Sequence, residues 1–151
     1  MTSPQDVTRK MVRDELKSFV IGAYSPAPLN IPAEHVLGYS ADNLAGKSPV
    51  VQVTSGGMNQ LDMQTFKGKF NVYHMQFEHF VIHSATNWTE EQAEDAIDEM
   101  ARLALKLIAD NKTHKPYWKS LELEGRTLVD KVQHRGLWYL YEVIPLQIKV
   151  F

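Results

Sequence analysis

Residues 87–110 decide the fold, and they read NWTEEQAEDAIDEMARLALKLIAD. Thr89 and Gln92 have the spacing of a capping box, in which the hydroxyl accepts from one backbone N–H and the Gln side chain reaches back to the other. Apolar residues then recur at helical spacing, with acidic residues on the opposite face. We therefore expect a helix over 89–110. The side chains expected to face the sheet are Met100, Ala104 and Leu107.

In the second half of this helix the apolar arc is wider than one face. Leu103 and Leu105 flank the core-facing stripe. A helix that is apolar beyond one face needs cover on a second side. We expect a neighbouring subunit to supply that cover.

The preceding run, FNVYHMQFEHFVIHS over 70–84, has no helical stripe and is rich in β-branched and aromatic residues, which favours a strand. Fully extended, it would span about 50 Å, whereas a globule of this chain length is about 40 Å across. The strand must therefore bend, break or pair with another subunit.

A shorter strand is expected over 48–54, where SPVVQVT ends at a Ser-Gly-Gly turn. Residues 55–69 then predict a flexible polar loop. Isolated apolar residues in this loop are expected to form a contact surface. They are Leu61, Met63 and Phe66.

At the other end of the chain, Ser3 followed by Pro4 predicts the start of a helix over 5–21 that ends at Gly22. Prolines and glycines then interrupt residues 24–47, which forbids continuous hydrogen-bonded structure. This segment is expected to be a proline-rich arm with one short turn near 33–37.

A hairpin is expected to close the chain, with strands near 125–133 and 137–150 around the turn His-Arg-Gly at 134–136. Its second strand is apolar on both sides in the first half. Pro145 cannot donate to a ladder, so it indicates a sheet edge, a bulge or a break between two strand segments.

Together these elements predict one α+β domain over 1–151, with a mostly antiparallel four-stranded sheet flanked by two main helices. The composition, 44% hydrophobic and 23% charged, is that of an ordinary packed protein. A formal net charge of −2 argues against a dedicated nucleic-acid-binding protein, whose affinity would rest on clustered cations. We expect no membrane span and no signal peptide, and therefore a cytosolic origin.

The sequence predicts no catalytic residue, no cofactor and no metal. The chain has no Cys, which removes thiolate nucleophiles and disulfides. His79 and His83 would meet at one metal on a helix, but on a strand they lie about 13 Å apart, so we expect both to face solvent. The six acidic residues within 90–99 are explained by the solvated face and first turns of a helix. The Ser-Gly-Gly lacks the following lysine and hydroxyl residue of a phosphate loop.

The layout as a whole resembles the tail terminator (tail completion) proteins of long-tailed bacteriophages. The matching parts are the first helix, the proline-rich arm, the SPVVQV strand with its Ser-Gly-Gly, the long strand 70–84, the helix that begins NWTEE, and the closing hairpin. The resemblance covers most of the chain and rests on architecture and residue texture. Members of that family form hexameric rings that cap the tail tube, stop its growth and join the DNA-filled head, and they carry no catalytic residues.

The resemblance implies a virion structural protein that is made in the host cytoplasm and placed at the head-proximal end of the tail. Its expected partners are further copies of itself in a ring, expected to be a hexamer, the tail tube protein, and a head-completion or neck protein. DNA would pass through the ring without specific binding, and no membrane would be involved. The sheet edges, formed by strand 70–84 and the last strand, are expected to lie on the seam between subunits. The expected interface residues are Leu61, Met63, Phe66, Leu103, Leu105, Tyr139 and Tyr141.

Two other interpretations stay open. The chain is also consistent with another head–tail connector or neck protein, because the same ring-forming logic serves either joint. A small cytosolic α+β enzyme or ligand-binding domain is the second alternative, with a pocket over the sheet. The residues expected to line that pocket are Tyr139, Tyr141, His74 and His79.

Overall fold

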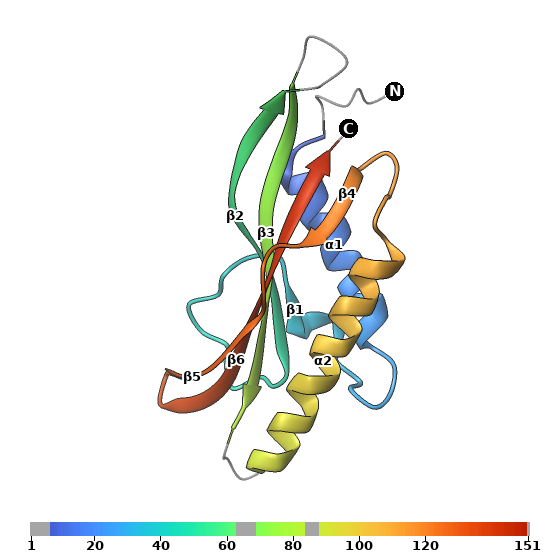
Figure 1. Ribbon diagram of the computed structural model, residues 1–151. Coiled ribbons are helices and arrows are strands. Elements are labelled where there is room, and N and C mark those ends of the chain that lie inside the picture. The colour runs from blue at the N-terminus through green and yellow to red at the C-terminus, as the bar shows by residue number, and fades with distance from the viewer. Residues whose placement is uncertain (1–6, 63–68, 84–87, 151) are drawn as a thin grey trace.

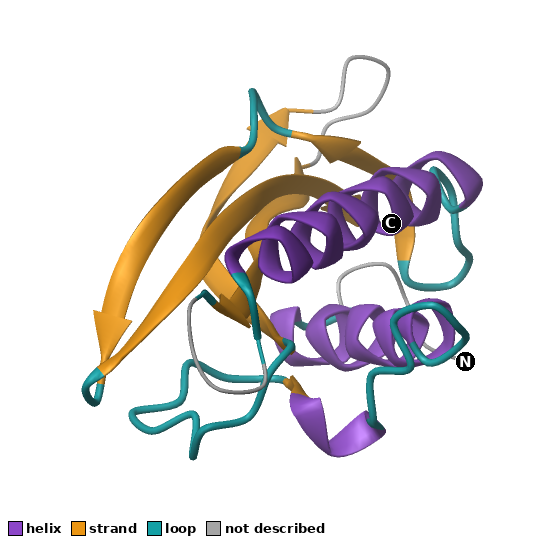
Figure 2. Ribbon diagram, turned by 90° about the horizontal axis from the view of Figure 1, so that it is seen from below, coloured by secondary structure: helices purple, strands orange, loops and turns teal. Residues whose placement is uncertain are grey.

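The computed structural model describes residues 7–62, 69–83 and 88–150. Two helices pack side by side on one face of a twisted sheet, so the fold is α+β, as expected (Figures 1 and 2). The sheet has six strands and is mixed, and the expectation of four strands was therefore wrong.

The first helix, α1 (Arg9–Tyr24), begins later than expected. Thr8 caps it by accepting from the backbone N–H of Met11, whose sulfur accepts from the N–H of Thr8 in return. Ser3 lies outside the described residues. The helix also continues past Gly22, because a glycine in an exposed helical turn costs only about 1 kcal/mol and two further residues allow Tyr24 to be buried.

The second helix, α2 (Glu90–Asp110), confirms the prediction from the capping box. Thr89 accepts from the N–H of Gln92, and the Gln92 side chain accepts from the N–H of Thr89. The stripe predicted to face the sheet is buried as expected. It comprises Met100, Ala104 and Leu107.

The strand order is β1-β2-β3-β6-β4, with β5 also pairing β6. Only β1 and β2 run parallel. Two strands were not expected: β1 is two residues long and follows a 3₁₀ turn inside the proline-rich arm, and β4 precedes the closing hairpin. The strands are β1 (Val36–Leu37), β2 (Val50–Asp62), β3 (Lys69–Ile82), β4 (Trp118–Leu123), β5 (Leu128–His134) and β6 (Leu137–Val150).

The Ser-Gly-Gly at 55–57 is a β-bulge and not a turn. The register against β3 shifts between Ser55 and Gly57, and the strand then continues to Asp62. The expectation of a loop over 55–69 was wrong for residues 55–62 and for Lys69, because glycines that permit a turn equally permit a bulge. Residues 63–68 lie outside the described residues.

The long strands β3 and β6 lie in the middle of the sheet, paired on both sides. The prediction that they form its edges was therefore wrong; the length of β3 is accommodated by an elongated, twisted sheet (Figure 1). Strands β4 and β5 share one side of β6, and Pro145 lies at the junction between them, where its carbonyl accepts from Glu124 N–H. Because proline has no backbone N–H, Pro145 cannot donate a hydrogen bond on this side of β6, which explains why the pairing with β4 and the pairing with β5 are interrupted here.

Two apolar clusters hold the fold together. The larger lies between the helices and the sheet, and the smaller lies on the opposite sheet face. Residues of the proline-rich arm take part in both, with Ile31 in the larger cluster and Leu44 in the smaller one. The arm therefore packs on the domain.

Candidate functional site

A polar cluster lies buried between the helices and the sheet. The Tyr24 hydroxyl is 2.9 Å from Nε2 of His79 and 3.0 Å from the carbonyl oxygen of Met100. On the other side of the imidazole, Nδ1 is 3.6 Å from a carboxylate oxygen of Glu142, longer than a hydrogen bond. Nδ1 of His79 and this Glu142 oxygen therefore have no hydrogen-bond partner among the described residues.

The expectation that His79 and His83 face solvent was wrong, because both are buried. His79 stands on the same face of β3 as Phe77 and Val81, which pack under the helices. An exchange of His79 for Gln is therefore a change in the buried interior and not at the surface. Alternation along a strand indicates which residues share a face, but it does not say which face is covered.

Burial disfavours the charged forms of His79 and Tyr24 in this cluster. Burial lowers the pKa of His79, against the opposing effect of Glu142. Burial, and then the charge of Glu142, raise the pKa of Tyr24 well above its ordinary value. The three side chains are at most 4% exposed, so no substrate reaches them, and the cluster is part of the packing.

A second polar cluster lies on the opposite sheet face, around the carboxylate of Glu78. Thr54 and Gln76 donate to one of its oxygens at 2.8 and 3.1 Å, and the Tyr141 hydroxyl donates to the other at 2.7 Å. Burial and the carboxylate raise the pKa of Tyr141 above its ordinary value. Tyr141, an expected interface residue, thus has its hydroxyl engaged within its own chain.

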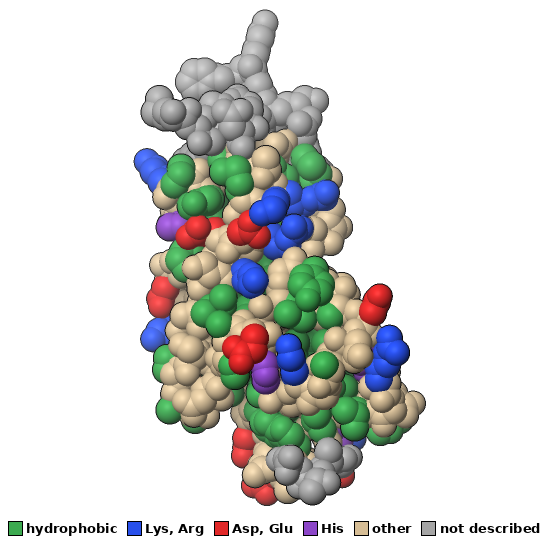
Figure 3. Space-filling view, turned by 180° about the vertical axis from the view of Figure 1, so that it is seen from behind, with side chains coloured by type: hydrophobic (Ala, Val, Ile, Leu, Met, Phe, Trp, Pro, Cys, Tyr) green, Lys and Arg blue, Asp and Glu red, His purple; other side chains and the backbone are tan. Residues whose placement is uncertain are grey.

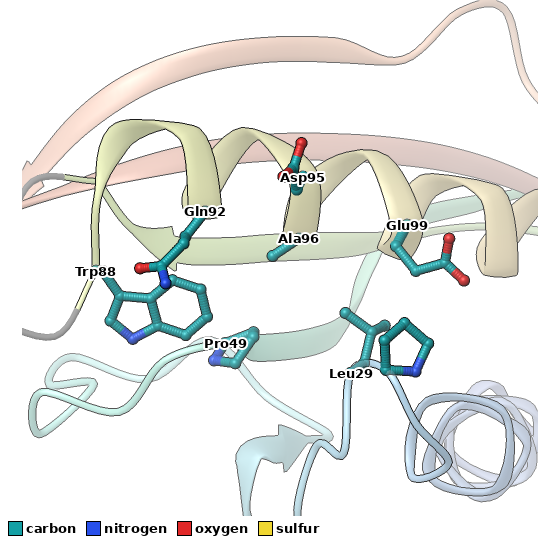
Figure 4. A pocket seen from close by; sticks show the side chains of 8 residues that line it. Leu29, Pro49, Trp88, Gln92, Asp95, Ala96 and Glu99 are labelled. Atoms are coloured by element: carbon teal, nitrogen blue, oxygen red, sulfur yellow. The ribbon is translucent and has the colours of Figure 1, made fainter.

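A groove of about 450 Å³ runs along the first half of α2. Its apolar surface comes from Trp88 and Ala96 on one side and from Leu29 and Pro49 on the other (Figure 4). Gln92 and Glu99 also point across it, and the Asp95 carboxylate is turned away at the rim. The groove is the size of a small-molecule site and open enough for a protein side chain. Its lining residues are Pro28, Leu29, Pro49, Trp88, Gln92, Asp95, Ala96 and Glu99.

A second groove, of about 370 Å³, lies between α1 and the second half of α2, and Glu99 lines both. Leu103 lines it together with Phe19, so this expected interface residue is half-buried between the two helices. Leu105 is 45% exposed on the outer face of α2.

The other expected interface residues are dispersed. Tyr139 is buried in the smaller apolar cluster. Leu61 stands in β2 opposite Phe70, and Met63 and Phe66 lie outside the described residues. The residues expected to line the alternative pocket are not brought together on one face either, because His79 is buried beneath the helices and Tyr139 is buried in the smaller cluster on the opposite sheet face.

Exposed apolar side chains that the sequence did not single out lie on both faces of the β5–β6 hairpin, with Val129 and Trp138 on one face and Leu128 on the other. Leu128, Val129 and Trp138 are 48–56% exposed. Trp138 shares a face of β6 with Leu140, but the helices do not extend over this end of the strand. How far a helix covers a strand is decided by tertiary packing, and the alternation of residues along the strand does not indicate it.

Charge is distributed unevenly between the hairpin and α2. Residues 90–99 carry six acidic side chains and no basic one, whereas residues 131–138 carry Lys131 and Arg135 and no acidic one. On the face seen in Figure 3, by contrast, acidic and basic side chains lie among apolar ones.

Among the described residues, no three His, Cys, Asp or Glu side chains gather in a way that could hold a metal ion. Neither described helix has the length and apolar character needed to cross a membrane.

In comparison with known proteins, no protein-family model matches the chain, and no curated protein matches it either.

Proposed function

We propose that this protein is a virion structural protein whose copies form a ring that caps the tail tube of a long-tailed bacteriophage, ends tail polymerisation and joins the tail to the head. The resemblance of the layout suggests this role, and the open edges of the sheet support the ring.

The observation that carries the proposal is the outer side of β2. This strand pairs with β3 along its length, but on its other side it pairs only with β1, at Val51 and Gln52. No other described strand lies along residues 53–62. Backbone donors and acceptors on a long open edge are a template for pairing with another chain.

The opposite edge of the sheet is formed by β5 and β4, and the strand that each of them pairs with is β6. The N–H of Leu121 on the outer side of β4 already donates to the carbonyl of Lys112, so β5 is the open part of this edge. The two edges differ in sequence and in partners, so a contact between them joins one surface of a copy to a different surface of the next. Repeated contacts of this kind generate closed rings when the rotation closes. A ring is the form that the proposed role requires.

Native mass spectrometry and electron microscopy of the purified protein test the proposal, and rings of a single stoichiometry, with six copies the expected number, are predicted. Met58→Lys places a charge on the open edge at a half-exposed position and should abolish the rings. Tyr39→Lys changes an exposed aromatic residue of the arm and should leave them intact.

A second assay addresses the role itself. Adding the wild-type protein to polymerising tail tube protein should stop tube growth, and Met58→Lys should not. A protein that forms rings yet leaves tube growth unchanged, and that binds head-completion proteins instead, would support another connector of the neck.

A ligand-binding α+β domain is the second candidate function, and the groove beside Trp88 favours it. An apolar floor with a few polar groups is typical of small-molecule sites, and this groove has Gln92 and Glu99 beside its apolar side chains. A protein that stays monomeric at high concentration and is stabilised by a small molecule would support this function over the ring.

A further inference from the structure

We propose that the β5–β6 hairpin of one copy docks into the groove beside α2 of the next copy, with Trp138 on the apolar floor and Lys131 and Arg135 facing the acidic rim. This inference rests on the proposed ring and names a second contact between neighbouring copies, in addition to the pairing of their sheet edges.

The hairpin is suited to be the inserted element. It is a narrow two-stranded ribbon that carries three of the exposed large apolar side chains of the described residues. Its two-residue turn, Arg135-Gly136, has positive φ at both positions, which fits the twist of a tight hairpin. Trp138 is about half exposed, and tryptophan is the residue type that most often dominates binding energy at protein interfaces.

The groove is suited to receive it. The described residues leave about 450 Å³ between Trp88 and Ala96 on one side and Leu29 and Pro49 on the other. These side chains offer an apolar floor to an indole ring, and aromatic pairs in offset or edge-to-face contact add to the burial of apolar area. The indole of Trp88 supplies such a pair.

Charge complementarity selects this occupant. The inserted residues 131–138 carry two cations, and the helix that forms one wall carries six acidic residues in its first ten positions. Glu99 is already paired with Arg102, whereas Asp95 makes no ion pair with a described residue. Asp95 is therefore the acidic side chain assigned to Arg135 of the neighbouring copy.

The hairpin of a copy does not fill its own groove. Along the sheet order, β5 is separated from β2 by β6 and β3, a distance of three strand spacings or about 14 Å. The groove lies beside Pro49, which directly precedes β2. Trp138 does not line this groove, although Trp88 of its wall packs against the smaller apolar cluster together with Val132 and Leu137 of the hairpin. The hairpin and the groove are therefore different surfaces near the same end of the molecule, and a contact between the hairpin of one copy and the groove of the next joins two different surfaces.

Sedimentation velocity and native mass spectrometry of single variants test the contact. Trp138→Ala and Asp95→Arg should each weaken association at least about 10-fold, while both variants stay folded because both positions are exposed. Tyr39→Ala, at an exposed aromatic position of the proline-rich arm, is the control and should assemble like the wild type.

Two combinations make the test specific. The exchange Asp95→Arg with Arg135→Asp in one chain should restore the rings that each change alone abolishes. A mixture of Trp138→Ala and Asp95→Arg chains keeps one intact hairpin and one intact groove, so it should form heterodimers and no ring. A raised salt concentration should weaken the wild-type assembly through screening of the charge contact.

The failure of this contact differs from the failure of the proposed function. A wild-type protein that remains monomeric at all concentrations overturns both. Rings that form normally with Trp138→Ala and Asp95→Arg overturn only the hairpin contact and leave the ring. Rings that form normally but no longer stop tube growth in these variants would assign the groove to the tube protein instead, and would also overturn the contact between copies.

Discussion

Tyr24→Phe removes one buried hydroxyl and leaves the aromatic ring in place. In the wild type this hydroxyl lies 2.9 Å from Nε2 of His79 and 3.0 Å from the carbonyl oxygen of Met100. Nδ1 of His79 has no hydrogen-bond partner among the described residues, and the side chain is fully buried. After the substitution, the described residues leave the imidazole without any hydrogen bond.

The magnitude follows from two contributions. A typical hydrogen bond contributes about 0.5–1.5 kcal/mol net, and a buried polar group left without a partner costs about 1–3 kcal/mol. The phenylalanine ring still fills the site, so no large cavity term is added. The free energy of unfolding should therefore fall by about 2–4 kcal/mol.

Urea unfolding at fixed protein concentration measures this loss. With a slope of about 2 kcal/mol per molar urea, the midpoint should fall by about 1–2 M while the slope stays constant. Tyr39→Phe, at a position 61% exposed, is the control and should change stability by less than about 0.5 kcal/mol. If Tyr24→Phe were as stable as this control, the buried cluster would contribute nothing and the reasoning would be refuted.

A double-mutant cycle separates the cluster from simple packing. Tyr24→Phe combined with His79→Leu removes both partners, and replacing both by apolar groups of similar shape can be nearly neutral. The double variant should therefore lose less stability than the sum of the two single variants, by at least about 0.5 kcal/mol. Additive losses would show that the two side chains do not depend on each other.

The remaining predictions concern packing, titration and backbone conformation. Leu107→Ala should lower the free energy of unfolding by about 2–5 kcal/mol because the side chain is buried, whereas Leu105→Ala should stay within about 0.5 kcal/mol; equal losses in urea unfolding would contradict the assignment of the stripe. Burial lowers the pKa of His79 below its value in the unfolded chain, so the unfolded chain binds more protons and the free energy of unfolding should fall as the pH drops below about 6.5. His79→Gln should make the free energy of unfolding depend less steeply on pH in this range. An unchanged pH dependence in this variant would contradict the assignment to His79. Gly57→Ala should destabilise by about 1 kcal/mol or more because φ is +120° in the bulge, while Gly22→Ala, with open space around its Cβ in the helix, should stabilise by about 0.5–1 kcal/mol; thermal unfolding that ranks the two in the opposite order would refute this.

Features decided by neighbouring residues could be predicted from the sequence. The capping box of Thr89 and Gln92 specifies the start of α2 through hydrogen bonds that span three residues. The turn at Arg135-Gly136 specifies the last hairpin for the same reason, since its conformation depends on two residues. The α+β class follows from such elements, because each periodic pattern is local.

Features that depend on pairing between distant segments could not be predicted. The Ser-Gly-Gly at 55–57 permits both a turn and a bulge, and only the strand β3 opposite it selects the bulge. The two shortest additions to the sheet, β1 and β4, exist because β2 and β6 present edges to them. Strand order, and with it the position of the sheet edges, is likewise set by which long strands meet.

The candidate site divides in the same way. The sequence by itself determined that α2 is acidic in its first half and that β6 is apolar on two faces. Only the tertiary structure decided that His79 and Glu142 lie beneath the helices and that Trp138 lies beyond them. The physical reason is that a strand's alternation divides its residues between two faces, whereas exposure depends on where packed helices, placed by contacts far apart in the sequence, begin and end.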